Sequence, residues 1–160
     1  MEPFWIETGN ELRVAIAPRP RGGDWLEDEA ISMKKAGVDV LVSMLRDEEA
    51  AELGLTAEAA ACRNAGIEFK SFPIQDREVP AHLASFKALI EQLRAELHSG
   101  RSVAVHCRAS IGRASLLLAG VLGAKGFSPE DAFKRLSTAR GLQVPDTDEQ
   151  VRWIERFAAG

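Results

Sequence analysis

Apolar residues are distributed along the chain in two alternating patterns. Short continuous runs rich in Val, Leu, Ile and Ala are typical of strands buried in a parallel sheet. Longer segments carry apolar residues at every third or fourth position, which is typical of helices with one buried face. The short runs predict strands at 12–17, 38–45, 67–74 and 102–106, and the longer segments predict helices at 24–37, 56–66, 80–100, 113–126, 128–141 and 146–157.

The alternation of strands and helices predicts βαβ units, and therefore an α/β fold with a mostly parallel central sheet of about four or five strands flanked by helices. The 160 residues are enough for one domain with a substantial core, so we expect a single domain over 1–160. In such sheets ligands bind outside the carboxyl ends of the strands. This rule directs attention to residues 18–24, 46–48, 74–80 and 107–113.

Composition narrows the classes of function. With 20 Lys and Arg against 24 Asp and Glu, the formal net charge is −4, which argues against broad binding to nucleic acid or to a membrane surface. The two cysteines make no disulfide framework and the three histidines are scattered, so we expect neither a metal nor a cofactor. No signal-peptide pattern or membrane-spanning apolar run is visible, so a cytoplasmic protein is expected. The sequence leaves the oligomeric state open.

The stretch VAVHCRASIGRAS (103–115) places Cys107 directly after a predicted strand and Arg113 at the start of a predicted helix. Backbone N–H groups at a helix start are unpaired and partly positive, and a tight loop before them adds further donors for an anion. Gly112 permits a close turn, and the planar guanidinium of Arg113 is suited to gripping two phosphate oxygens. The same positive field stabilises a thiolate, so Cys107 is predicted to attack phosphorus and form a phosphocysteine.

This combination of residues is specific. His-Cys followed five residues later by Gly-Arg is expected by chance in about one chain of this size in several thousand. The alternative interpretation is a buried structural cysteine beside a core histidine. The segment HCRASIGR (106–113) matches the H-C-x5-R signature of the cysteine-dependent protein phosphatases, and the chain most resembles their compact dual-specificity and bacterial tyrosine-phosphatase branch. We call residues 107–112 the signature loop.

The resemblance implies a role for each residue of this segment. It makes Cys107 the nucleophile and Arg113 the phosphate-binding arginine, while His106 hydrogen-bonds nearby backbone and supports the thiolate. The remaining loop residues are implied to bind phosphate: Arg108, Ala109, Ser110, Ile111 and Gly112.

The segment FPIQDREVP (72–80) follows a strand and should lie on the same rim. Expelling an alkoxide or phenolate needs a proton donor. The resemblance assigns this role to Asp76, which then acts as the base on the attacking water. Glu78 is the alternative donor, and an aspartate that only forms a turn is the alternative interpretation. By weaker resemblance Gln150 positions the water, and an ordinary surface glutamine is equally compatible with the sequence.

The sequence departs from the family pattern after the arginine. Relatives usually place Ser or Thr there, with its hydroxyl on the cysteine sulfur, but this chain has Ala114. Ser110 or Ser115 is the candidate substitute, and Ser110 is favoured because one step along a helix rotates a side chain by about 100°. If neither compensates, the phosphoenzyme should hydrolyse slowly.

Five arginines fall on the predicted ligand side, where they would form a positive mouth that favours a substrate with several negative groups. The alternative is that they only solvate loops. They are Arg19, Arg21, Arg46, Arg77 and Arg108. The second cysteine, Cys62, is expected to be a small core residue, with a regulatory disulfide to Cys107 as the alternative.

The leading hypothesis is a phosphomonoester hydrolase, a protein-tyrosine or dual-specificity phosphatase that acts on a phosphorylated protein or a small phosphorylated substrate. One alternative is a catalytically impaired module that binds phosphate or a phosphoprotein. Another is a phosphatase for a non-protein polyanion such as an inositol phosphate. A thiol redox or sulfur-transfer enzyme finds no support in a C-x-x-C pair.

Overall fold

The computed structural model describes residues 2–9 and 11–160, and its centre is a five-stranded sheet in the order β1-β2-β5-β3-β4. β5 lies between β2 and β3, with Val103 opposite both Val14 and Val40, and all these pairings are parallel. β1 is the antiparallel edge strand. The strands are β1 Phe4–Trp5, β2 Val14–Ile16, β3 Val40–Ser43, β4 Glu68–Ser71 and β5 Val103–His106.

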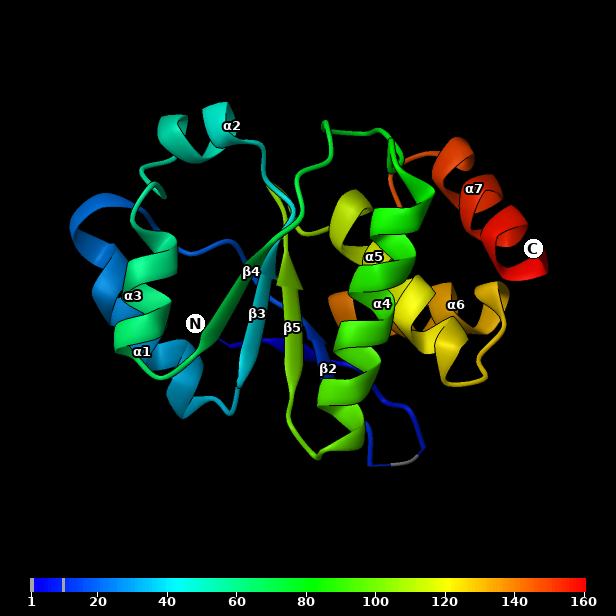
Figure 1. Ribbon diagram of the computed structural model, residues 1–160, viewed down its shortest axis with the longest axis horizontal. Helices are drawn as coiled ribbons and strands as arrows, with labels where there is room; N and C mark the ends of the chain where they lie inside the picture. Colours follow the sequence, from blue (N-terminus) through cyan, green and yellow to red (C-terminus); the bar gives the residue numbers. More distant parts are fainter. Residues whose placement is uncertain (1, 10) are drawn as a thin grey trace.

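Two helical layers cover the sheet (Figure 1). α1 and α3 pack together on one side, α4 to α7 lie on the other, and α2 lies near the carboxyl ends of the strands. The helices are the short 3-10 turn η1 Gly23–Trp25, then α1 Leu26–Lys35, α2 Asp47–Glu52, α3 Glu58–Asn64, α4 Leu83–His98, α5 Gly112–Ala124, α6 Pro129–Arg140 and α7 Asp148–Ala159.

The side chains of β5 alternate between the two layers, as strand geometry requires. Val103 and Val105 belong to the core cluster formed with α4, α5 and α6. Ala104 packs instead with Met33 of α1 and Cys62 of α3. Because β5 is central and its four residues are buried, its carboxyl end delivers the next residues to a fixed point on the sheet edge.

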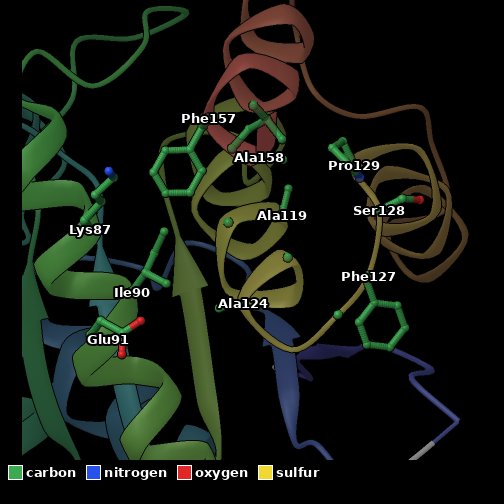
Figure 2. A pocket seen from close by; sticks show the side chains of 14 residues that line it. Lys87, Ile90, Glu91, Ala119, Ala124, Phe127, Ser128, Pro129, Phe157 and Ala158 are labelled. Carbon is green, nitrogen blue, oxygen red and sulfur yellow. The ribbon is translucent and has the colours of Figure 1, made fainter. Parts of the chain in front are cut away.

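α5 is the central helix that its composition predicts. Every residue from Gly112 to Leu122 is buried. α4 packs closely against it, since a Cβ added at Gly120 would lie 2.6 Å from Ile90 Cδ1. An apolar pocket of about 630 Å³ opens beside this contact, between α4, α5 and α7, and no residue of the signature loop lines it (Figure 2).

The predicted α/β class, the parallel sheet and the order of elements are confirmed, with element ends shifted by a few residues. Two elements were not predicted. β1 is only two residues long, and α2 has the sequence DEEAAE, which carries no apolar period. The helix expected from residue 80 begins at Leu83, whose side chain is exposed, while Phe86, Leu93 and the other apolar residues of its inner face are buried.

In the part of the chain that the structure describes, no helix is long and apolar enough to cross a membrane. The same residues contain no cluster of three His, Cys, Asp or Glu side chains suited to holding a metal ion.

Candidate active site

The signature loop leaves β5 and enters α5 with its carbonyl groups turned outward. Arg140 of α6 donates from Nε to the carbonyl oxygen of Ser110 at 3.1 Å and from Nη2 to that of Ala109 at 3.2 Å. Arg19 Nη1 donates to the carbonyl oxygen of Arg108 at 3.4 Å. In a trans peptide the N–H points opposite to the C=O. The N–H groups that follow these carbonyls therefore face away from the arginines and are available to an anion.

Ser110 fixes the middle of the loop. Its backbone has a φ of 56°, a left-handed conformation that is uncommon outside glycine. Its buried hydroxyl donates to the carbonyl oxygen of Ala17 at 2.6 Å, just after β2. The loop is thus tied both to the neighbouring strand and to α6.

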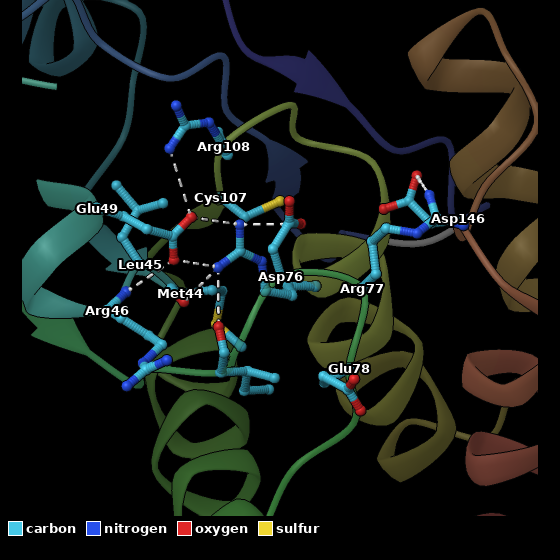
Figure 3. Close-up of polar contacts among 12 residues, drawn as sticks. Met44, Leu45, Arg46, Glu49, Asp76, Arg77, Glu78, Cys107, Arg108 and Asp146 are labelled. Atoms are coloured by element: carbon cyan, nitrogen blue, oxygen red, sulfur yellow. Dashed lines mark hydrogen bonds and ion pairs between the residues drawn. The ribbon is translucent and has the colours of Figure 1, made fainter. Parts of the chain in front are cut away.

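Arg113 lies in the first turn of α5 with its side chain 1% exposed. Its guanidinium binds Glu49 of α2 through two parallel contacts, Nη1 to Oε1 at 2.7 Å and Nη2 to Oε2 at 3.1 Å. Nη1 also donates to the carbonyl oxygen of Ile74 at 2.8 Å, and Nη2 lies 3.2 Å from Asp76 Oδ1 (Figure 3). These contacts hold the guanidinium in one orientation beside Cys107.

The electrostatics keep Arg113 charged in spite of its burial. Burial lowers its pKa, but the hydrogen bond to Glu49 and the negative charges of Cys107, Glu49 and Asp76 outweigh that effect and raise it. Burial likewise raises the pKa of Glu49, but hydrogen bonds from Arg113 and the Arg46 backbone N–H, with the charges of Arg113 and Arg108, bring it below its ordinary value. The buried guanidinium of Arg113 is therefore charged, is paired with Glu49 on one side, and lies near the thiol of Cys107.

Residues 72–80 follow β4 and carry both candidate proton donors, and we call this segment the acid loop. The Asp76 side chain is 53% exposed. Arg77 next to it has a φ of 64°, and a turn closes from Glu78 N to the carbonyl oxygen of Gln75. Figure 3 shows Asp76 beside Cys107, and the side chain of Glu78 pointing elsewhere. Of the two candidate proton donors, Asp76 is the one that lies at the thiol.

α7 braces the acid loop against the signature loop. Gln150 is buried, and its Oε1 accepts from the N–H groups of Asp146 and Thr147 at 3.0 and 3.3 Å. Its Nε2 donates to the carbonyl oxygen of Glu78 at 3.1 Å. Gln150 is therefore not a surface glutamine, and these contacts give it a structural task beside the predicted positioning of water.

Gly112 is the first residue of α5 rather than the last residue of the loop. A Cβ at this position would collide with Asp146 Oδ2 and approach Gln150 Nε2. The glycine leaves room for these two side chains at the start of α5, and it is not required by backbone conformation, because its φ is not positive.

Neither candidate serine places its hydroxyl on the Cys107 sulfur. The hydroxyl of Ser110 is directed to Ala17, and that of Ser115 is buried without a hydrogen-bond partner among the described residues. The preference for Ser110 as the substitute was wrong in this respect, since its hydroxyl ties the loop to β2. Ala114 is fully buried and offers no donor.

Four of the five arginines expected to form a positive mouth lie in ion pairs. Arg108 lies 3.8 Å from Glu49 and 3.6 Å from Glu52. Arg46 pairs with Glu48 at 2.8 Å, and Arg77 lies 4.0 Å from Asp146. Arg21 pairs with Glu29 at 3.0 Å and stacks on Trp25. Arg19 differs from the other four, because among the described residues its side chain contacts the carbonyl oxygen of Arg108 and lies in no ion pair.

Cys62 is the small core residue that its helix predicts. It packs with Met33 and Ala104 on the α1 and α3 side of the sheet, whereas Cys107 belongs to the cluster on the α5 side. Both cysteines are free thiols.

Three residues of the site were not predicted from the sequence: Glu49 on Arg113, Arg140 on the signature loop, and Glu58, which binds His106. Glu49 had a weak signal, because a glutamate in the first turn of a helix often accepts from the backbone N–H three residues before it, as it does here from Arg46. Arg140 and Glu58 gave none, since each meets its partner across 30 or more residues.

Comparison with known proteins agrees with this geometry. Residues 17–126 match the family model described as "Polymorphic toxin system, DSP-PTPase phosphatase". No curated protein matches the chain by sequence.

Several solved structures share the fold. Kinase associated phosphatase (KAP), with its catalytic-site cysteine changed to serine, is 20% identical, covers 99% of this chain and 94% of that chain, and has a TM-score of 0.89. PTPMT1 in complex with PI(5)P is 20% identical over 97% and 95%, with a TM-score of 0.77. Tk-PTP in the active form is 21% identical over 97% of each chain, with a TM-score of 0.75.

Proposed function

The chain belongs to the DSP-PTPase phosphatase family of polymorphic toxin systems, and from this premise we propose that it hydrolyses phosphate monoesters through a phosphocysteine on Cys107. Arg113 binds the phosphate, and Asp76 exchanges the proton. The observation that carries the proposal is the meeting of these three side chains at the carboxyl end of β5, with Arg113 Nη2 3.2 Å from Asp76 Oδ1 and Cys107 acting electrostatically on the same guanidinium.

In the first step the Cys107 thiolate attacks phosphorus, the P–S bond forms and the bond to the ester oxygen breaks. The leaving oxygen takes the proton of Asp76, so an alcohol or phenol departs. The guanidinium of Arg113 and the inward N–H groups of the signature loop stabilise the phosphoryl oxygens during transfer. A phosphate oxygen that binds Arg113 Nη2 takes the place of the Asp76 carboxylate there and frees it to reach the leaving group.

In the second step water attacks phosphorus, Asp76 takes a proton from the water and the P–S bond breaks, which releases phosphate and regenerates the thiolate. A hydrogen-bond donor beside the sulfur would stabilise it as the P–S bond breaks. The side chain of Ala114 cannot donate such a bond. The hydroxyls of Ser110 and Ser115 do not reach the sulfur either. Hydrolysis of the phosphoenzyme is therefore the slow step, and the phosphoryl group stays on Cys107 longer than it would with a serine at 114.

We assign the substrate class as phosphorylated protein, on tyrosine or with dual specificity. The ion-paired arginines of the rim supply little free positive charge, which disfavours a polyanion such as an inositol phosphate. A panel of phosphotyrosine, phosphoserine and phosphothreonine peptides, an inositol phosphate and a short polyphosphate tests this assignment. A kcat/KM higher for the polyanions than for the peptides would contradict it.

The reaction itself is tested with p-nitrophenyl phosphate. We expect the wild-type protein to hydrolyse it and Cys107→Ser to bind inorganic phosphate without hydrolysis. Cys62→Ser is the matched control, because it changes the other buried thiol, on the opposite face of the sheet. Hydrolysis by Cys107→Ser at the wild-type rate would refute the proposal.

A further inference from the structure

A buried pair of an acid and a histidine lies directly behind Cys107. His106 is the last residue of β5 and Glu58 the first residue of α3, and their side chains are 0% and 4% exposed. His106 Nε2 lies 2.6 Å from Glu58 Oε2, and His106 Nδ1 lies 3.3 Å from the carbonyl oxygen of Cys107. The imidazole ring therefore bridges a carboxyl group on α3 and the peptide of the proposed nucleophile.

The proton count of this bridge is constrained. A carbonyl oxygen only accepts, so Nδ1 has to carry a proton. A neutral ring with its proton on Nδ1 has a lone pair on Nε2, and a lone pair cannot hydrogen-bond an ionised carboxylate. The contact of 2.6 Å therefore contains one more proton, on Nε2 or on Glu58. With the proton on Nε2, the two opposite charges neutralise each other inside the core and form a short, charge-assisted bond.

We propose that Glu58 is a positioning residue that keeps His106 as a buried imidazolium, and that this cation stabilises the Cys107 thiolate. The inference rests on the function proposed above. The ring lies between the carboxylate and Cys107, so the positive end of the pair faces the signature loop and the negative end faces α3. The same hydrogen bonds fix the orientation of the Cys107 peptide, because Nδ1 donates to its carbonyl oxygen.

Neighbouring ionisable groups fit this charge arrangement. Cys62 follows Glu58 by about one turn on α3, and burial together with the negative charge of Glu58 raises the pKa of its thiol to about 12. Cys62 thus stays neutral and does not compete for the ring. From α5, Arg113 supplies the second cation near Cys107. In this proposal Cys107 has two positive neighbours, His106 at its carbonyl oxygen and Arg113, of which only Arg113 is expected to touch the phosphate.

The first experiment reads the proton directly in the wild-type protein. A long-range ¹H–¹⁵N NMR spectrum distinguishes a ring protonated on both nitrogens from a neutral one, and His106→Asn identifies the signal. We expect both nitrogens of His106 to be protonated at pH 7. A ring with an unprotonated Nε2 would overturn the inference whether or not any Glu58 variant folds.

The second experiment measures what the proton does. Glu58→Gln keeps the size and can donate to Nε2, which makes the ring neutral. We expect the rate of Cys107 alkylation by iodoacetamide at pH 6, followed by peptide mass spectrometry, to fall about tenfold in this variant and to approach the wild-type rate at pH 9. The kcat for p-nitrophenyl phosphate should fall with it, while the affinity for inorganic phosphate changes little.

The matched control is Asp39→Asn at the other end of β5, where Asp39 accepts from Ser102 N at 2.9 Å. It should lower the unfolding temperature without moving the alkylation profile. If Glu58→Gln, corrected for its folded fraction, has the wild-type alkylation profile, Glu58 is only structural and the inference is wrong. Turnover by wild-type but not by Cys107→Ser would then leave the proposed function intact, whereas turnover by Cys107→Ser would remove the proposed function itself.

Discussion

A hydrogen-bonded carboxyl group lies at each end of strand β5, Asp39 at the amino end and Glu58 at the carboxyl end. At the amino end Asp39 accepts from Ser102 N at 2.9 Å and donates its own N–H to Ser102 Oγ at 2.8 Å, and Lys34 lies 3.1 Å from its carboxylate. At the carboxyl end the buried carboxyl group of Glu58 contacts the side chain of His106, the last residue of β5. Only the pair of Glu58 and His106 lies beside Cys107, the proposed nucleophile.

The difference lies in what surrounds each carboxyl group. At the amino end Asp39 is hydrogen-bonded to Ser102 and ion-paired with Lys34. The carboxyl end holds Ser110 and Arg77 with positive φ, and a guanidinium that is buried yet charged. A left-handed non-glycine residue costs roughly 1 kcal/mol, so this end stores strain and desolvated charge that the amino end avoids. The amino end of β5 thus contributes to stability, whereas the residues proposed to react gather at its carboxyl end.

Arg113→Lys should have the largest effect, because it removes the planar fork from the carboxyl end. Lysine keeps the charge but cannot make the two parallel bonds to Glu49 or grip two phosphate oxygens. We expect kcat/KM for p-nitrophenyl phosphate to fall by about 10³-fold. Arg135→Lys on α6 is the control and should leave kcat/KM nearly unchanged. A loss of less than about tenfold in Arg113→Lys would show that the fork is not used in the reaction.

Arg140→Ala should come next, since it releases the carbonyls of Ala109 and Ser110 and lets the signature loop relax. We expect the Kd for inorganic phosphate to rise about tenfold, as loss of a charge-assisted contact implies. Arg135 is again the matched control, because it lies on the same helix, stacks on Phe127 and donates to the carbonyl oxygen of Glu7. Equal phosphate affinities of the Arg140→Ala and Arg135→Ala proteins would contradict the orientation argument.

Ala114→Ser should act in the opposite direction. A hydroxyl beside the departing sulfur is expected to speed hydrolysis of the phosphoenzyme and to raise kcat by roughly fivefold, about one hydrogen bond's worth. Pre-steady-state kinetics should show a burst of p-nitrophenol in the wild-type protein that shrinks in the variant. A kcat that stays the same or falls would mean that the second step is not limiting.

The amino end gives the smallest effect, and it is visible only in stability. Burial raises the pKa of Asp39, but hydrogen bonds from Ser102 and Lys34 and the charges of Lys34 and Arg13 bring it below its ordinary value. A lowered folded-state pKa stabilises above the unfolded value of about 3.9 and is lost as the pH falls through the folded value. Asp39→Asn should therefore cost about 1 kcal/mol at pH 7 in urea unfolding, and less as the pH falls below 4. A pH-independent difference would contradict this.

The sequence predicted those features of the site that depend on residues close together in the chain. The apolar run of residues 102–106, the apolar helix behind the signature loop and the spacing of Cys107 and Arg113 each have a pattern of their own. The segment of Asp76 was placed on the ligand edge of the sheet because it follows a strand, and the resemblance to the phosphatases then singled out Asp76 within it. The contacts that a single polar residue makes across the fold have no such pattern.

Glu49, Glu58 and Arg140 were missed for that reason. Glu49 lies on a short polar helix, and its partner Arg113 is 64 residues away. The partners of the rim arginines could not be predicted either. The sequence gives the positive charge of Arg46 and Arg108, but it does not show which acidic residue pairs with each. The positions of the arginines therefore predicted a positive mouth, whereas in the structure Arg46 and Arg108 lie in ion pairs.

The central claim is that a phosphoryl group passes through the sulfur of Cys107. The most direct measurement is rapid acid quench of the wild-type protein during turnover, followed by intact and peptide mass spectrometry. We predict one phosphoryl group per chain, on the peptide that contains Cys107, and its accumulation as the main species because Ala114 slows the second step. Turnover at the normal rate with no phosphoryl group on this peptide would contradict the account.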